Sequence, residues 1–343
     1  MKIVVADQME PEILGALKEF GTVSYFGDIK VADEKRVRVK KELREGATVL
    51  VVRSETIVDF ELITAAPKLK IIARSGVGLD NIKVMDECRT LGIEVLNTPD
   101  AHAINVAEHA LYLMLAVAKV NGKVHERTAA GEWPKKTSKP MELYGATLGL
   151  VGFGRIGRRL AYLAKTLGMN IIFFDTDKTI EVKFPKTMKY AKRADTLESL
   201  LRVSDVVSLH LPENDATRGI INVSTIAKMK DGAILVNTGR GRVIVETDLA
   251  AALFIGKLRG AGLDVFAEEP YKCGSLSNIP NVFMTPHIAS ATKAAQLRCG
   301  QEIVKLLRER VGIGEQAVTV LPGRNGTSSA TGTSRRPRGV TSG

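Results

Sequence analysis

One stretch constrains the fold of this chain more than any other: residues 152–157 read Gly-Phe-Gly-Arg-Ile-Gly, a G-x-G-x-x-G pattern. Before it, residues 148–151 form a short apolar run that is typical of a buried parallel strand. After it, residues 158–168 have the apolar spacing of a helix, and residues 171–174 form a second apolar run that ends at Asp175. This order predicts a dinucleotide-binding βαβ unit, although an ordinary βαβ unit with a glycine turn stays the alternative.

The three glycines and the acid would have separate roles in such a unit. Gly152 would permit the tight turn, Gly154 would let the backbone approach a pyrophosphate, and Gly157 would let the helix pack against the strand. The pyrophosphate would sit on free N–H groups at the helix N-terminus. Asp175 would accept hydrogen bonds from the adenosine ribose and repel a 2′-phosphate, so we expect NAD as the cofactor. Two nearby basic residues weaken that preference over NADP.

The composition is that of a globular protein: 45% of the 343 residues are hydrophobic and 25% are charged, which suggests two domains. No apolar run reaches transmembrane length, and the first residues read as a strand and not as a signal peptide, so no membrane contact is expected. Cys88, Cys273 and Cys299 are too widely spaced for a metal site or a disulfide framework. We therefore expect a cytoplasmic protein without a metal.

The formal net charge is +11, and part of it lies at the C-terminal end. Residues 321–343 contain four arginines, no acid, and mostly Gly, Ser, Thr and Pro, so we expect a disordered tail there. The remaining positive charge could attract anionic substrates or nucleic acid. We interpret it as a solvated surface, because no nucleic-acid-binding motif accompanies it, and expect no nucleic-acid partner.

Strand-like runs alternate with helical patterns along the chain, which predicts an α/β fold with doubly wound parallel sheets. Two early strands end at Arg53 and Arg74, and the second runs directly into Ser75-Gly76-Val77-Gly78. Parallel sheets bind ligands at the carboxyl ends of their strands. The glycine-rich loop could hold a carboxylate, and the two arginines could hold a second anionic group. Surface arginines on a simple connection are the alternative.

Three polar residues follow predicted strands in the half that carries the glycine motif. Arg240 follows residues 233–237, Glu269 follows the strand at 260–265, and His287 follows residues 282–285. A cation, a carboxylate and an imidazole beside a nicotinamide would form a carbonyl-reducing site, although each residue alone is also common on surfaces. Residues 176–196 are expected to be irregular. The basic arm at 121–146 is interpreted as a surface loop or a subunit contact.

Together these stretches resemble the D-2-hydroxyacid dehydrogenase family over about residues 1–312. The resemblance implies a Rossmann NAD domain inserted into a discontinuous, flavodoxin-like substrate domain, and a homodimer formed through the NAD domain. Residues 1–98 plus 288–320 would form the substrate domain, residues 99–287 the NAD domain, and residues 321–343 the tail. The matching stretches are residues 74–81, 97–99, 106–108, 152–157, 237–241, 262–266, 269–270 and 286–287.

The resemblance also implies roles for individual residues. His287 would be the general acid/base, Glu269 its hydrogen-bond partner, and Arg240 the residue that binds the substrate carboxylate and polarises the carbonyl. The implied cofactor contacts are Thr98, Gly152, Gly154, Arg155, Ile156, Gly157, Asp175, His210, Leu211, Pro212, Thr238, Gly239, Asp264, His287 and Ala289. The implied substrate contacts are Arg53, Arg74, Ser75, Gly76, Val77, Gly78, Asn97 and Arg240.

Within the family, the resemblance is greatest to members that oxidise 3-phospho-D-glycerate to 3-phosphohydroxypyruvate, the first step of serine biosynthesis. Arg53 and Arg74 support that substrate, since a phosphate needs cations that glyoxylate does not. A glyoxylate or hydroxypyruvate reductase would have the same catalytic residues and stays the main alternative. A corepressor-like protein that senses NAD is a more remote one. The chain shows no match to the regulatory domain of longer members, so feedback inhibition by serine is not expected.

Overall fold

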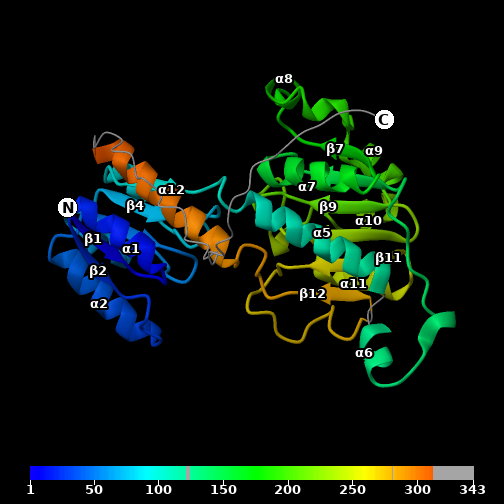
Figure 1. Cartoon of the computed structure of the whole chain (residues 1–343), viewed down its shortest axis with the longest axis horizontal. Coiled ribbons are helices and arrows are strands. Elements are labelled where there is room, and N and C mark those ends of the chain that lie inside the picture. The colour runs from blue at the N-terminus through cyan, green and yellow to red at the C-terminus, as the bar shows by residue number, and fades with distance from the viewer. Residues whose placement is uncertain (121–123, 280, 312–343) are drawn as a thin grey trace, which may run out of the picture.

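The computed structural model describes residues 1–120, 124–279 and 281–311, which form two α/β domains (Figure 1). Each domain contains one sheet, and every pairing between named strands is parallel. Helices cover both faces of each sheet, so the apolar side chains form a separate core on each face. The predicted fold class, two doubly wound parallel sheets, is confirmed.

The sheet of the first domain has the strand order β2-β1-β3-β4-β5, which is the flavodoxin-like order. Its topological switch point lies between β1 and β3. The edge strand β2 and the short helix α4 were not predicted, because β2 is only partly buried and has no continuous apolar run. The elements are β1 (Lys2–Val5), α1 (Pro11–Leu17), η1 (Lys18–Phe20), β2 (Thr22–Tyr25), α2 (Ala32–Arg44), β3 (Val49–Val52), α3 (Phe60–Thr64), β4 (Ile71–Arg74), α4 (Met85–Thr90) and β5 (Glu94–Asn97).

The last described helix, α12 (Lys293–Val311), returns to the first domain and lies along α1 (Figure 1). Ile303, Val304 and Leu307 of α12 are buried in the same core as Ile13 and Leu17 of α1. Burying one such aliphatic side chain contributes about 1.5–3 kcal/mol. Both ends of the described chain therefore build the first domain, and the second domain is inserted between them.

The sheet of the second domain has the order β12-β11-β10-β9-β6-β7-β8, which is the Rossmann order extended by one strand. Its switch point lies between β6 and β9. Residues 176–196, expected to be irregular, contain a short edge strand, β8, whose three residues give too little periodicity to detect. The strands are β6 (Thr147–Val151), β7 (Asn170–Phe174), β8 (Ala191–Arg193), β9 (Val206–Leu209), β10 (Ala233–Asn237), β11 (Leu258–Leu263) and β12 (Val282–Met284).

The helices of the second domain include the long α5, which packs on α7 and against β10 and β11. No helix within the part of the chain that the structure describes is long and apolar enough to cross a membrane. The predicted tail at 321–343 lies outside the described residues. The helical segments are α5 (Ala103–Val120), α6 (Val124–Ala129), η2 (Pro134–Lys136), α7 (Arg155–Thr166), α8 (Ile180–Lys183), η3 (Thr187–Lys189), α9 (Leu197–Val203), α10 (Val223–Lys228), η4 (Gly241–Val243) and α11 (Glu246–Phe254).

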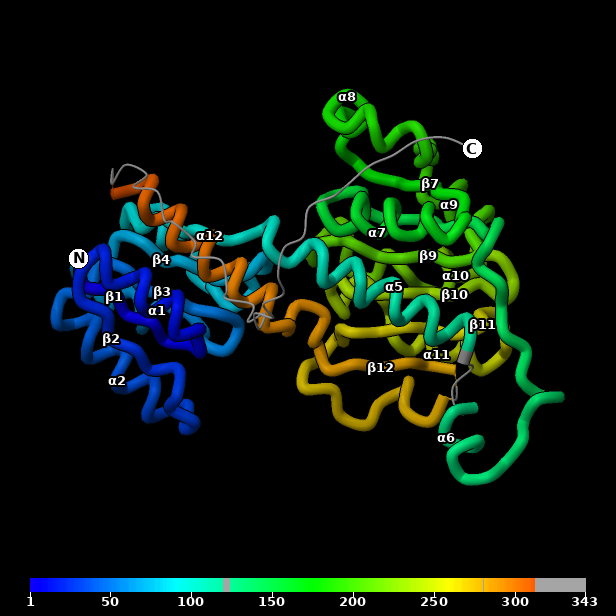
Figure 2. Tube along the Cα trace, in the orientation of Figure 1, coloured from blue at the N-terminus to red at the C-terminus, as the bar shows by residue number. Residues whose placement is uncertain are grey.

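The chain crosses between the domains twice, before α5 and after β12, as the tube in Figure 2 shows. Hydrogen bonds join the two crossings. Arg298 of α12 donates from Nε to the carbonyl of Ala101 (3.1 Å) and from Nη2 to Asn105 Oδ1 (2.5 Å). The Cys299 thiol lies 2.9 Å from Nε2 of His102, and both side chains are buried. The crossings therefore form one braced connection beside the site described next.

Candidate active site

The glycine turn between β6 and α7 has the features that a pyrophosphate requires. Gly152 has a φ of +90°, and a Cβ there would lie 2.5 Å from the carbonyl oxygen of His210. A Cβ on Gly157 would lie 2.4 Å from the carbonyl oxygen of Gly152, so helix and turn need glycine to pack this closely. Around Gly154 the space is open, and no side chain caps the N-terminus of α7. Free N–H groups at a helix N-terminus fit a phosphate.

Asp175 lies at the end of β7, beside this turn. Its Oδ2 accepts a hydrogen bond from the backbone N–H of Phe153 (2.6 Å), and its Oδ1 accepts one from Asp177 (2.8 Å). The carboxylate lines a cleft of about 560 Å³ together with Gly154 and Arg155. It is therefore fixed at the edge of a cleft that leads to the phosphate turn. Arg155 itself forms an ion pair with Asp100.

Several buried polar groups near the switch point of the second sheet have no hydrogen-bond partner among the described residues. They include Thr238 Oγ1 and His210 Nδ1. Burial lowers the pKa of His210 to about 4, so its imidazole is neutral, and its Nε2 lies 3.0 Å from the Ser208 hydroxyl. Buried polar groups are normally satisfied. Their placement beside the glycine turn fits a polar ligand such as a dinucleotide.

The other expected cofactor contacts surround this turn. Leu211 and Pro212 follow His210, and a Cβ on Gly239 would lie 3.0 Å from the Leu211 carbonyl oxygen. Ile156 packs against the core beneath the turn. Thr98 is fully buried and lies at the crossing, where its N–H donates to the carbonyl of Gly76 (2.9 Å). These positions stay predictions as cofactor contacts.

His287 and Glu269 form the pair predicted from the sequence. His287 Nδ1 lies 2.7 Å from Glu269 Oε2, and Glu269 Oε1 accepts a hydrogen bond from the N–H of Phe266 (3.1 Å). The hydrogen bond to Glu269 raises the pKa of His287, against the effect of desolvation. Burial alone would raise the pKa of Glu269. The hydrogen bond from His287 stabilises the carboxylate, and the pKa is lowered. Because Nδ1 is engaged, Nε2 is the nitrogen left for proton transfer.

Asp264 organises the loop that carries His287. Its carboxylate is fully buried and accepts hydrogen bonds from the Thr285 hydroxyl (2.6 Å) and from the N–H groups of Ile288 and Ala289 (2.9 Å each). His287 has a φ of 54°, a left-handed conformation that costs about 1–3 kcal/mol in a non-glycine residue. Its N–H donates to the Asp264 carbonyl (2.8 Å). The described contacts thus make Asp264 a support of the histidine loop.

Arg240 leaves the end of β10 on a turn that Asn237 shapes. The Asn237 side chain donates to the carbonyl of Arg240 (2.9 Å) and accepts from the N–H of Gly239 (3.0 Å). The Arg240 charge lies close enough to His287 to oppose the rise of the histidine pKa. The catalytic residues predicted from three separate strands therefore meet at one sheet edge. Asn237 was not predicted as a site residue, and its position directly after the apolar run at residues 233–236 was the available signal.

The glycine-rich loop after β4 approaches this edge from the first domain. Asn97 donates to the carbonyl of Val77 (2.8 Å), which fixes the loop against β5. Arg74 donates from Nη1 to the carbonyl of Ser75 (3.2 Å), and its buried Nε has no partner among the described residues. Asp80, at the end of the loop, forms an ion pair with Arg240 (2.6 Å). The loop predicted to bind substrate and the catalytic residues thus lie together.

Arg53 follows β3 at the switch point of the first sheet. The buried carboxylate of Asp7 accepts hydrogen bonds from the N–H groups of Arg53 (2.6 Å) and Thr56 (3.1 Å). Asn81 donates to the carbonyls of Arg53 (2.8 Å) and Thr56 (2.7 Å), which ties this loop to the glycine-rich loop. Sequence reasoning did not assign Asp7 or Asn81. Asp7 directly follows the first strand, so its position at a strand end was the available signal.

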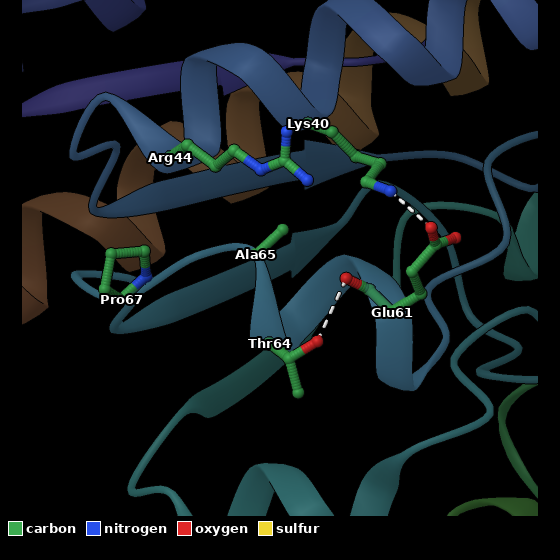
Figure 3. A pocket seen from close by; sticks show the side chains of 6 residues that line it. All are labelled: Lys40, Arg44, Glu61, Thr64, Ala65 and Pro67. Carbon is green, nitrogen blue, oxygen red and sulfur yellow. Dashed lines mark hydrogen bonds and ion pairs between the residues drawn. The ribbon is translucent and has the colours of Figure 1, made fainter.

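A second hollow, of about 400 Å³, lies beside α2 and α3 of the first domain, and none of the residues described above lines it (Figure 3). Lys40 reaches across it to an ion pair with Glu61, and Thr64 donates to the Glu61 carbonyl (3.2 Å). Arg44 also faces the hollow. Its lining residues include no histidine and no glycine turn, so the candidate active site is the one at the facing strand ends.

A fold of two doubly wound sheets, with a glycine turn and an acid/base pair at the strand ends, defines a nucleotide-dependent dehydrogenase. The model of the D-isomer specific 2-hydroxyacid dehydrogenase NAD-binding domain matches residues 111–289. The chain belongs to the D-isomer specific 2-hydroxyacid dehydrogenase family. Its cofactor is NAD(H), and the residues of the glycine turn fit that group.

Relatives within the family have different names. The chain is 46% identical over 268 residues to a hydroxypyruvate reductase of Thermotoga maritima, covering 77% of this chain and 85% of the relative. It is 41% identical over 312 residues to a D-3-phosphoglycerate dehydrogenase of Methanocaldococcus jannaschii, covering 90% of this chain but 58% of that longer relative. A crystal structure of a glyoxylate reductase from Paecilomyes thermophila aligns with a TM-score of 0.80 at 32% identity, covering 92% of this chain and 96% of that one.

Proposed function

We propose that this dehydrogenase oxidises 3-phospho-D-glycerate to 3-phosphohydroxypyruvate with NAD, the first step of serine biosynthesis. The observation that carries the proposal is the pair of cations at the strand ends of the first domain, Arg53 and Arg74. Neither forms an ion pair with a carboxylate among the described residues, and the Nε atom of Arg74 is buried without a hydrogen-bond partner there.

Burying a cation without a partner is costly, because burial removes hydration that only an opposite charge or hydrogen bonds can replace. Both arginines are half-buried, and the cost applies above all to Arg74, whose Nε is buried. Burial lowers the pKa of Arg74, and the charges of Arg240 and Arg53 lower it further, although Cys299 and Asp80 oppose them. The same positive field acts on His102, whose pKa falls to about 4 through burial and then through Arg74 and Arg53. A second anionic group on the substrate would relieve this field, and a phosphate supplies one.

The catalytic residues have clear roles in such a reaction. Arg240 would bind the carboxylate of the 2-hydroxy acid and polarise the adjacent C–O bond. In oxidation, Nε2 of neutral His287 would accept the hydroxyl proton, while Glu269 stabilises the resulting imidazolium through Nδ1. In reduction, the same imidazolium would donate the proton to the carbonyl oxygen. NAD(H), when bound, accepts or supplies the hydride.

A second candidate is reduction of hydroxypyruvate or glyoxylate. The observation in its favour is the 46% identity to a hydroxypyruvate reductase over 85% of that relative's length. The catalytic residues would act in the same way on either substrate. The two candidates differ only in whether the Arg53 and Arg74 charges are used.

The test is a comparison of initial rates at 340 nm. NADH formation is measured with 3-phospho-D-glycerate, and NADH consumption with hydroxypyruvate and glyoxylate. Efficient turnover of the phosphorylated acid with weak use of the other two would support the proposal. The reverse pattern would make the protein an oxoacid reductase, and absence of turnover with all three would contradict both candidates.

We further propose the domain boundaries given by the resemblance, 1–98 plus 288–320 for substrate and 99–287 for NAD. The completion of the first core by α12 supports them.

A homodimer through the NAD domain is proposed as well. The 80% exposed Trp133, on the arm beside α6, supports a contact there. Absence of a dimer in light scattering would reject that part. We also propose that the protein is cytoplasmic.

A further inference from the structure

Asp80 forms an ion pair with Arg240 that connects the two domains. Asp80 ends the glycine-rich loop after β4 of the first domain, whereas Arg240 follows β10 of the second. Arg240 Nε donates to Asp80 Oδ1 (3.2 Å), and Nη2 donates to Asp80 Oδ2 (2.6 Å). The Arg240 guanidinium lowers the pKa of Asp80 although burial opposes the shift, so the carboxylate is charged at neutral pH.

The pairing uses one particular edge of the guanidinium. Asp80 occupies the edge formed by Nε and Nη2, and Nη1 donates to the carbonyl of Gly239 (2.8 Å). A guanidinium has five N–H donors in a rigid planar fork. Three are therefore engaged, and one donor on each of Nη1 and Nη2 is left. These two nitrogens form the edge that a carboxylate binds with two parallel hydrogen bonds.

Gly78 makes the pairing sterically possible. A Cβ on Gly78 would lie 2.1 Å from Nη2 of Arg240 and 2.5 Å from Oδ2 of Asp80. Both atoms are ends of flexible side chains, so an alanine would displace the ion pair without a clash with backbone. Gly78 does not have a positive φ, so the sign of its φ does not itself require glycine. The loop therefore needs glycine here so that the ion pair can lie against its backbone.

We propose that Asp80 is a positioning residue: by holding one edge of Arg240 across the domain boundary, it presents the other edge to the substrate carboxylate. The role rests on the proposed function of Arg240. Because the anchor lies in the first domain, Arg240 is aligned only when the glycine-rich loop is beside the catalytic edge. Substrate binding is thereby coupled to the relative position of the two domains.

The test uses the whole chain with Asp80 changed to Asn. The kcat/KM for hydroxypyruvate and 3-phosphohydroxypyruvate is expected to fall about 10- to 100-fold, the usual effect of misplacing a binding group. The Kd of NADH, measured by fluorescence titration, is expected to stay within about twofold. Gly78→Ala should lower kcat/KM in the same direction, because it displaces the pair without removing a charge. A weaker NADH affinity or a lower Tm that accounts for the loss would overturn the proposal.

A matched control and a double mutant separate the possible failures. Glu19 and Arg308 form an ion pair of the same bidentate geometry (2.6 and 2.9 Å) outside the site, so Glu19→Gln should leave kcat/KM unchanged. In an Arg240→Gln background, Asp80→Asn should have no further effect on kcat/KM. If Arg240→Gln retains full activity, the proposed role of Arg240 in binding the substrate carboxylate fails, whereas the rate comparison at 340 nm tests the proposed reaction separately. Arg240→Gln could instead abolish activity while Asp80→Asn leaves kcat/KM unchanged or strengthens substrate affinity. In that case only the role of Asp80 is overturned.

Discussion

Two regions of this site differ in how their polar groups are satisfied. At the catalytic edge of the second domain, Glu269 holds His287, and Asp264 holds the loop around it. At the strand ends of the first domain, Arg53 and Arg74 have backbone carbonyls but no carboxylate partner among the described residues. In the first region the acid/base pair and its loop are held by hydrogen bonds within the protein, whereas the second region has two cations without a carboxylate partner among the described residues.

The difference separates the residues that carry out the reaction from the residues that select the substrate. Groups that transfer a proton must keep one geometry, so their orientation is fixed by internal hydrogen bonds. Groups that select a substrate keep hydrogen-bonding capacity for a ligand, and a substrate that lacks the matching group leaves them unpaired. Relatives that are named for different substrates can therefore have the same catalytic residues. The following changes test this division, from the largest expected effect to the smallest.

Replacement of His287 by Ala should remove the proton transfer that all substrates of the enzyme require. We expect kcat to fall about 10²- to 10⁴-fold for every 2-hydroxy or 2-oxo acid, because general acid/base catalysis contributes that much. The Kd of NADH should change little. His125→Ala, in the exposed α6, serves as the control. Near-normal turnover in His287→Ala would remove this residue from the mechanism.

Replacement of Glu269 by Gln should change the pH dependence. Reduction needs the imidazolium, so kcat/KM for an oxoacid falls as pH rises through the pKa of His287. Glu269 raises that pKa, and its loss should move the falling limb to lower pH. We expect about a tenfold loss of activity at pH 8. A limb that stays in place or moves to higher pH in the measured pH–rate profile would show that another group titrates.

Replacement of Asp175 by Ala should raise the ratio of kcat/KM for NADP over NAD roughly tenfold, the effect of removing about 1–2 kcal/mol of charge repulsion. The side chain also accepts backbone N–H groups from Phe153 and Asp177, so the alanine variant should lose NAD affinity too. Asp175→Asn retains one acceptor and separates the two effects. Binding titrations with both cofactors measure them, and an unchanged ratio would contradict the ribose assignment.

Replacement of Asp264 by Asn should mainly affect stability. The amide would place a donor against one of the N–H groups of Ile288 or Ala289, and loss of a buried hydrogen bond to a charged group costs about 2 kcal/mol. The Tm should fall by several degrees. Asp231→Asn, in a surface pair with Lys257, should leave it nearly unchanged. Equal Tm values for the two variants would show that Asp264 does not support the loop.

The sequence was sufficient for the features that depend on local pattern. Buried strands such as β4 and β10 are continuous apolar runs, and residues at or shortly after their carboxyl ends, including Arg74 and Arg240, necessarily lie at a sheet edge. The edge strands β2 and β8 were not detected, because short, partly exposed strands have no such run. The family and fold could therefore be predicted, whereas the edge strands β2 and β8 could not.

Contacts between distant residues could not be predicted in the same way. The Asp80–Arg240 pair joins residues 160 positions apart, and Asp7 supports the loop at Arg53 from 46 positions away. Local periodicity contains no information on such pairs. The partners of the predicted arginines, and hence which of them remain without a carboxylate, are visible only once the two sheets are placed together.

The most direct test of this division is the ratio of kcat/KM for 3-phosphohydroxypyruvate over hydroxypyruvate, with NADH, in the wild type and in Arg74→Gln. The two substrates differ only in the phosphate. A charge-assisted hydrogen bond contributes about 1.5–3 kcal/mol, so the ratio should be roughly 10- to 100-fold in the wild type and fall towards one in the variant. The kcat/KM for hydroxypyruvate should change little. A wild-type ratio near one, or a ratio that Arg74→Gln leaves unchanged, would contradict the account.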